Sequence, residues 1–188
     1  MESVKQLFFT QEEETKKSSH ITLPPRTSFH LLKNMQSDIF VIEGGITVNS
    51  SALETGAFVS TKGAIIENPT NEMAETFLYE EPYNEKHKEI LLQPYEYQWY
   101  FNNVPGLKQA KLRDWGHIVS LVQWETGTEI PFHIHDFGEE IYVLKGELFD
   151  RGTSIKKGEW KRMLPKDGHA PHTQEQTLIL LRNGHLLG

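Results

Sequence analysis

The sequence contains no cysteine. This absence excludes disulfide bonds, thiolate nucleophiles and every zinc or iron–sulfur site that needs cysteine ligands. The chain also lacks a glycine-rich phosphate-binding loop, a dinucleotide fingerprint and the G-x-S-x-G segment of many serine hydrolases. Any metal or catalytic chemistry must therefore use other side chains, above all imidazoles and carboxylates.

Long apolar runs and an excess of positive charge are also absent. No stretch is long and apolar enough to cross a bilayer as a helix, and the formal net charge is −7. A negative net charge argues against nucleic acid and anionic membranes as partners. The N-terminal stretch is acidic with only a short apolar patch, which is not typical of a signal peptide. We therefore expect a cytoplasmic protein that binds neither nucleic acid nor membrane.

The sequence does contain many short apolar runs, which are separated by Gly, Pro, Asn and Ser. They lie at 39–42, 57–59, 64–66, 76–79, 119–124, 140–144 and 178–181. Short runs of this kind predict the strands of a sandwich or barrel. No segment shows a sustained period of 3.6 residues. The sequence thus predicts an all-β fold.

Shifts in composition divide the chain into four parts. Residues 1–20 are polar around a short apolar patch and are predicted to form an N-terminal arm. The β pattern runs over 21–80, which we expect to be a first lobe. Residues 81–95 are charged, with a proline near each end, and are predicted to be a linker. The β pattern resumes over 96–188, the predicted second lobe.

One stretch of the second lobe, Gly127 to Gly146, combines two histidines and a carboxylate. His133 and His135 are one residue apart, and Glu139 follows four residues later. Side chains at i and i+2 of a strand point to the same face, so the two imidazoles are expected side by side. Two imidazoles with a carboxylate suit Fe, Zn, Mn, Ni or Cu. This stretch therefore predicts a metal site.

An internal repeat relates the two lobes. Shifting the first half by 102 positions places 38–44 on 140–146, 56–58 on 158–160, and 77–79 on 179–181. Glycines and apolar runs coincide, which indicates that one structural unit occurs twice.

The first copy lacks the polar residues of the second. Ser37 stands in place of Glu139, and only His30 matches a histidine, His133, after one gap. We therefore expect a degenerate first lobe without a metal.

The second copy resembles the cupin superfamily. Its spacing from Gly127 to Gly146 is G-x5-H-x-H-x3-E-x6-G, which is the first cupin motif. The segments EEIYVLKGEL, GEW (158–160) and GHAPH closely resemble the ChrR-like cupins. This group includes the cupin lobe of a zinc-containing anti-sigma factor and relatives of acetylacetone-cleaving dioxygenases. The resemblance implies two tandem double-stranded β-helix (jelly-roll) lobes, a bicupin, and we expect a homodimer.

The resemblance also implies a ligand set of His133, His135, Glu139 and His169 around one divalent metal ion, Fe, Zn, Mn or Ni. Two alternatives stay open. Glu140 is an alternative to Glu139, although the x3 spacing and the inward direction of the alternate residues favour Glu139. His172 is an alternative to His169, because the second cupin motif departs from the family spacing by about a residue.

Two functions from different classes follow from this resemblance. The first is a metal-dependent dioxygenase that cleaves a small oxygen-chelating substrate such as a β-dicarbonyl. The second is a non-catalytic sensor or regulatory cupin that binds a metal and a small-molecule ligand. A third and less specific hypothesis is a cupin that binds a sugar or another small molecule and whose metal is structural. The absence of cysteine argues against a zinc-binding anti-sigma domain in this chain.

Overall fold

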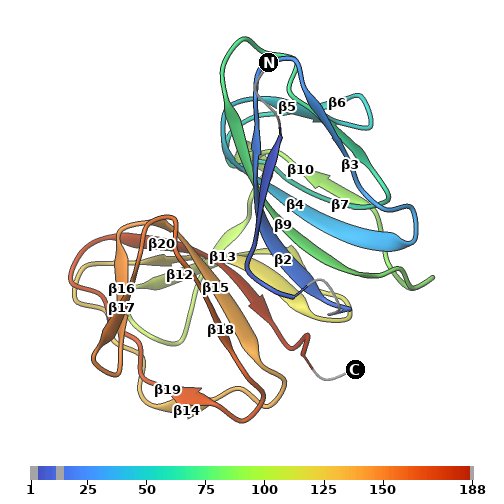
Figure 1. Ribbon diagram of the computed structural model, residues 1–188. Helices are drawn as coiled ribbons and strands as arrows, with labels where there is room; N and C mark the ends of the chain where they lie inside the picture. Colours follow the sequence, from blue (N-terminus) through green and yellow to red (C-terminus); the bar gives the residue numbers. More distant parts are fainter. Residues whose placement is uncertain (1–3, 12–14, 187–188) are drawn as a thin grey trace. The chain divides into compact units, whose positions relative to one another are not determined.

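The computed structural model describes residues 4–11 and 15–186, and it divides into two compact units (Figure 1). The first unit is Met1–Glu96 and the second is Tyr97–Gly188. The described part of the chain is built from strands, with one short 3-10 helix, η1 (Pro94–Glu96). Each pairing between the named strands is antiparallel, and the all-β prediction with two tandem jelly-roll lobes is confirmed.

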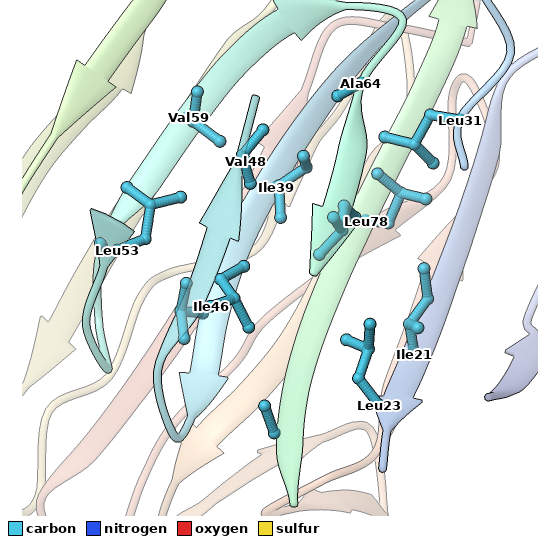
Figure 2. Close-up of a cluster of buried hydrophobic side chains, with 14 residues drawn as sticks. Ile21, Leu23, Leu31, Ile39, Ile46, Val48, Leu53, Val59, Ala64 and Leu78 are labelled. Atoms are coloured by element: carbon cyan, nitrogen blue, oxygen red, sulfur yellow. The ribbon is translucent and has the colours of Figure 1, made fainter. Parts of the chain in front are cut away.

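Two sheets make up the first unit. Its strands are β1 (Lys5–Phe8), β2 (Lys17–Leu23), β3 (Ser28–His30), β4 (Met35–Glu43), β5 (Ile46–Val48), β6 (Ser51–Leu53), β7 (Phe58–Lys62), β8 (Ile65–Glu67), β9 (Ala74–Pro82) and β10 (Ile90–Leu92). The larger sheet has the order β1-β2-β9-β4-β7-β10 and the smaller β3-β8-β5-β6. Alternate residues of these strands are apolar, and they meet in a buried cluster that includes Ile21, Ile39 and Leu78 (Figure 2).

The second unit has the same plan. Its strands are β11 (Trp99–Phe101), β12 (Leu107–Arg113), β13 (Ile118–Trp124), β14 (His133–Ile134), β15 (Glu139–Lys145), β16 (Glu147–Asp150), β17 (Thr153–Lys156), β18 (Trp160–Met163), β19 (Gly168–His169) and β20 (Thr177–Asn183). The large sheet has the order β11-β12-β13-β20-β15-β18, and β14-β19 and β16-β17 form two short ribbons. Ile141 and Val143 point into the core, as the predicted alternation requires.

Strand registers show that the repeat extends to three dimensions. Ser37 of β4 pairs with Thr61 of β7, and Glu139 of β15 pairs with Met163 of β18, at the same shift of 102 positions. The pairing of β4 with β9 has an irregularity between Val41 and Glu43, and β15 has one with β20 at the matching place. A shared β-bulge is a specific feature of a strand pair, since it fixes the local bend. The two units are therefore copies of one fold.

Parts of the predicted arm and linker lie in strands of the first unit. Of the residues expected to form the arm, 5–8 belong to β1 and 17–20 to β2, which pair with each other in the large sheet, whereas 1–3 and 12–14 lie outside the described residues. Residues expected to form a linker include β10, which pairs with β7 as an edge strand. Both edge strands are short, with four residues in β1 and three in β10, too few to show the alternation by which a strand is recognised. The extent of each lobe otherwise stays a prediction.

Candidate metal centre

The short ribbon β14-β19 (Figure 1) brings two histidines together. His133 lies directly opposite His169 in this antiparallel pair. His135 follows β14, and its backbone N–H donates to the carbonyl of Asp167, 3.1 Å away, which extends the pairing. His133 and His135 point to the same face because strand side chains alternate. Three imidazoles from two segments thus face one point.

A tight turn then returns the chain to the cluster and positions Glu139. Asp136 and Phe137 form the turn, and Gly138 follows with a φ of +73°. An added Cβ at Gly138 would come within 2.4 Å of a Leu186 methyl carbon. A residue without a side chain is therefore needed here, both for the backbone angle and for space. Glu139 begins β15 immediately after this turn.

The Nε2 atoms of the three histidines converge. Nε2 of His169 lies 2.9 Å from Nε2 of His135 and 3.0 Å from Nε2 of His133. All three rings offer a nitrogen within 4.8 Å of one another. Two nitrogen ligands that bind one ion at about 2.1 Å and at right angles are about 3.0 Å apart. The spacing of the imidazoles therefore suits adjacent ligands of one octahedral cation.

The Glu139 carboxylate completes the cluster. Its Oε2 lies 3.3 Å from Nε2 of His135, and its Oε1 lies 3.5 Å from Nε2 of His169. The Glu139 side chain is only 5% exposed. The carboxylate thus lies beside two of the three imidazole nitrogens, and three imidazoles with one carboxylate are a donor set that first-row metal ions accept.

Groups behind the imidazoles set the direction of their lone pairs. Nδ1 of His133 is 2.9 Å from the carbonyl oxygen of Pro131, an acceptor that requires a proton on Nδ1. Nδ1 of His169 faces Asp150, whose Oδ2 is 3.9 Å away. Asp150 is fixed by Lys161 at 2.8 Å and by the backbone N–H of Ala170 at 3.2 Å. With the proton on Nδ1, the lone pair on Nε2 is free for a cation.

Burial adjusts the charge of the cluster. It lowers the pKa of His135 and of His169 to about 4, with the neighbouring histidines contributing further, so both rings are neutral at pH 7. Burial also raises the pKa of Glu139 to about 8, assisted by Asp150 and opposed by the hydrogen bond from Asn183. Neutral imidazoles and a buried carboxyl group fit a cation, because a bound ion would compensate the charge that Glu139 acquires when it loses its proton.

The two alternative ligands lie elsewhere in the second unit. Glu140 points to the opposite face of β15, where it accepts a hydrogen bond from Arg162 at 2.6 Å and approaches His185 at 3.4 Å. The imidazole of His172 stacks on Phe149, with ring centroids 5.4 Å apart. The structure thus brings together His133, His135, Glu139 and His169, as the sequence predicted. Their role as metal ligands stays a prediction.

The corresponding places in the first unit hold apolar side chains. β3 pairs with β8 so that Phe29 lies opposite Ile66, and the backbone N–H of Leu31 donates to Ala64 as that of His135 donates to Asp167. Ile66 and Leu31 are buried in the core, and Phe29 packs against it.

This register corrects the alignment drawn from sequence. The core-facing pair of the first unit is Phe29 opposite Ile66, in the place of His133 opposite His169, whereas His30 lies opposite Ile65. His30 is exposed, because a shift of one residue turns a strand side chain to the other face. The loops differ in length between the two copies, so a single shift of 102 positions does not align the residues on both sides of a loop.

Asn183 and Asp150 contact the candidate ligands, and Lys161 contacts Asp150, but none of the three was anticipated. Asn183 ends β20, and its side-chain amide reaches both His135 and Glu139. These residues do not belong to a local motif. Asn183, for example, is 44 positions away in sequence from Glu139, which it contacts. A polar residue at the end of a buried apolar strand was the available signal.

A histidine cluster inside a jelly-roll lobe places the protein in the cupin superfamily. More specifically, residues 87–187, over half of the chain, match the model of the ChrR cupin-like domain (Cupin_7), and the chain belongs to this family. No curated protein matches it by sequence. No helix in the part of the chain that the structure describes has the length and apolarity to span a membrane.

Solved structures share the fold at low sequence identity. A candidate dioxygenase from Nostoc punctiforme is 18% identical with a TM-score of 0.80, covering 98% of this chain and 74% of its own. Protein Ylba from E. coli is 14% identical with a TM-score of 0.74, covering 96% and 82%. Salicylate 1,2-dioxygenase from Pseudoaminobacter salicylatoxidans, in adducts with gentisate, is 12% identical with a TM-score of 0.71, covering 95% and 73%.

Proposed function

We propose that the protein is a dioxygenase that holds one divalent metal ion through His133, His135, His169 and Glu139. Its substrate would be a small oxygen-chelating molecule such as a β-dicarbonyl. The observation that carries the proposal is the convergence of three imidazole Nε2 atoms, two of which also lie within 3.5 Å of the buried Glu139 carboxylate. The names of two relatives, a candidate dioxygenase and a salicylate 1,2-dioxygenase, support the reaction class.

Each residue has a defined part in this proposal. The chemistry that a bound Fe(II) ion would supply is polarisation of substrate oxygens and activation of O2. Four protein ligands leave two positions of an octahedral ion free for a chelating substrate or O2. Burial keeps His135 and His169 neutral and therefore able to bind a cation. Pro131 fixes the ring of His133, and Asp150 lies behind that of His169.

The experiment compares two histidine variants of the same unit. The protein is purified, its metal content measured, and the iron-loaded form tested for O2 uptake with β-diketones, gentisate and salicylate. We expect uptake by wild type and by His172→Ala, whose ring lies on Phe149 outside the cluster. We expect no uptake by His133→Ala, because one converging nitrogen is lost.

Other results would refute this proposal or favour a second candidate function. A protein that cannot be loaded with any divalent metal would refute the proposal, as would uptake that is undiminished in His133→Ala. Firm metal binding without uptake on any substrate would refute the enzyme and favour the second candidate, a cupin module that senses a small ligand. The observation that favours this alternative is the match of residues 87–187 to the ChrR cupin-like domain.

A further inference from the structure

Asn183 connects two of the candidate ligands. It is the last residue of β20 and pairs in register with Glu139, the first residue of β15. Its Nδ2 atom lies 3.1 Å from Nδ1 of His135 and 3.4 Å from Oε2 of Glu139. One amide therefore contacts an imidazole and a carboxylate that come from different segments.

The contact with Asn183 bears on which ring nitrogen of His135 is protonated, and therefore on whether Nε2 can bind a cation. A neutral imidazole has one proton, and its other nitrogen has the lone pair. Nε2 of His135 is the nitrogen that faces the cluster, 2.9 Å from Nε2 of His169. For Nε2 to bind a cation, the proton must sit on Nδ1, and a buried N–H needs an acceptor. The group beside Nδ1 is the Asn183 amide.

An amide can serve both protonation patterns of the ring. Its Nδ2 donates to an unprotonated Nδ1, the arrangement in the structure, in which the ring proton is on Nε2 beside Glu139. Half a turn of the amide presents Oδ1 instead, and this oxygen accepts from a protonated Nδ1. The same side chain thus matches His135 with a proton on Nε2 and His135 with a lone pair on Nε2.

We propose that Asn183 is a positioning residue that sets which ring nitrogen of His135 is protonated and so prepares Nε2 for the metal. This inference rests on the proposed function, because it concerns the metal site proposed there. The corresponding residue of the first unit is Glu80, which pairs with Ser37 as Asn183 pairs with Glu139. An amide stands at this position only in the unit that has the histidine cluster.

The test uses zinc affinity, a readout independent of turnover. Asn183→Leu keeps the size of the side chain and removes both hydrogen-bonding groups, and we expect about 10- to 100-fold weaker zinc binding. Asn183→Asp restores an acceptor for Nδ1–H, and we expect it to recover most of the lost affinity. Asn103→Leu makes the same change at an exposed turn and should bind zinc as wild type does.

A spectroscopic measurement separates positioning from simple loss of structure. Nitrogen-15 NMR of zinc-loaded protein with labelled histidine shows whether Nδ1 of His135 has a proton. We expect Nδ1–H in wild type and in Asn183→Asp. Thermal unfolding of the metal-free variants establishes that they are folded, and Asn183→Ala replaces Asn183→Leu if the latter is not.

The outcomes distinguish the two proposals. Wild-type protein that binds no divalent metal refutes the proposed function. Wild-type protein that binds zinc, together with Asn183→Leu that binds it equally well, refutes the role of Asn183 alone. An Asn183→Asp variant as weak as Asn183→Leu also refutes it, because the acceptor would then be without effect.

Discussion

At the scale of single residues, Glu139 is the group from which we expect the proposed metal binding to depend on pH. Burial raises the pKa of Glu139 to about 8, so in the metal-free protein its carboxyl is protonated below that pH. A metal must displace this proton, whereas His135 and His169, with pKa values near 4, are already neutral. We therefore expect zinc affinity to rise with pH below about 8, and the displacement of this one proton contributes up to about tenfold per pH unit. Competition titration with a chelator measures this slope.

The control for this dependence is Glu139→Gln, which has no proton to lose. Its zinc affinity should be lower and should rise less steeply with pH than that of wild type. The metal-free variant adds a second check, because a pKa raised from 4.5 means that Glu139 stabilises the fold at low pH and that this contribution is lost as pH rises toward about 8. The variant should lack that loss in denaturant unfolding. An equally steep slope in Glu139→Gln would contradict the assignment.

At the scale of structural elements, the turn between His135 and Glu139 depends on Gly138. Its φ is +73°, and an added Cβ would collide with the side chain of Leu186. We expect Gly138→Ala to lower the free energy of unfolding by more than the about 1 kcal/mol typical of a left-handed glycine, and to weaken zinc binding by displacing Glu139. Denaturant unfolding and zinc titration check both effects.

A second glycine of the same unit provides the matched control. Gly127 has a φ of +79°, and an added Cβ there would meet no atom within 4 Å. Gly127→Ala should therefore show the backbone cost alone, with zinc affinity unchanged. Equal effects of the two substitutions would mean that the contact with Leu186 has no role.

The elements also show what the sequence could reveal. Buried strands such as β13 and β20 were predicted because their apolar residues recur along a short run. His133, His135 and Glu139 were predicted because their spacing lies within one local motif, and His169, about 30 residues further on, was predicted only through the family resemblance. β10 and Asn183 were missed, since their places depend on pairing with strands distant in sequence. A local sequence pattern therefore indicates that a segment is a strand, whereas the strand with which it pairs depends on the topology of the whole sheet.

At the scale of the whole molecule, the protein is one fold repeated, with the polar cluster in one copy. The first unit has Phe29, Leu31 and Ile66 where the second has histidines, and these apolar residues belong to its core. The two cores are separate clusters, so each unit has its own source of stability. A ligand of the histidine cluster thus stabilises the second unit directly.

This arrangement predicts one metal ion per chain and a local gain in protection. Saturating zinc at about 100 times its Kd stabilises the state that binds it by about 2.7 kcal/mol. We expect hydrogen exchange to slow in β14, β15, β19 and β20, whose residues hold the cluster, and to stay unchanged in β3 and β8. Exchange measured by mass spectrometry, with metal content per chain, tests this. His30→Ala should leave both results unaltered, since His30 is exposed. Two bound ions, or equal slowing in β3 and β8, would show that the first unit also takes part.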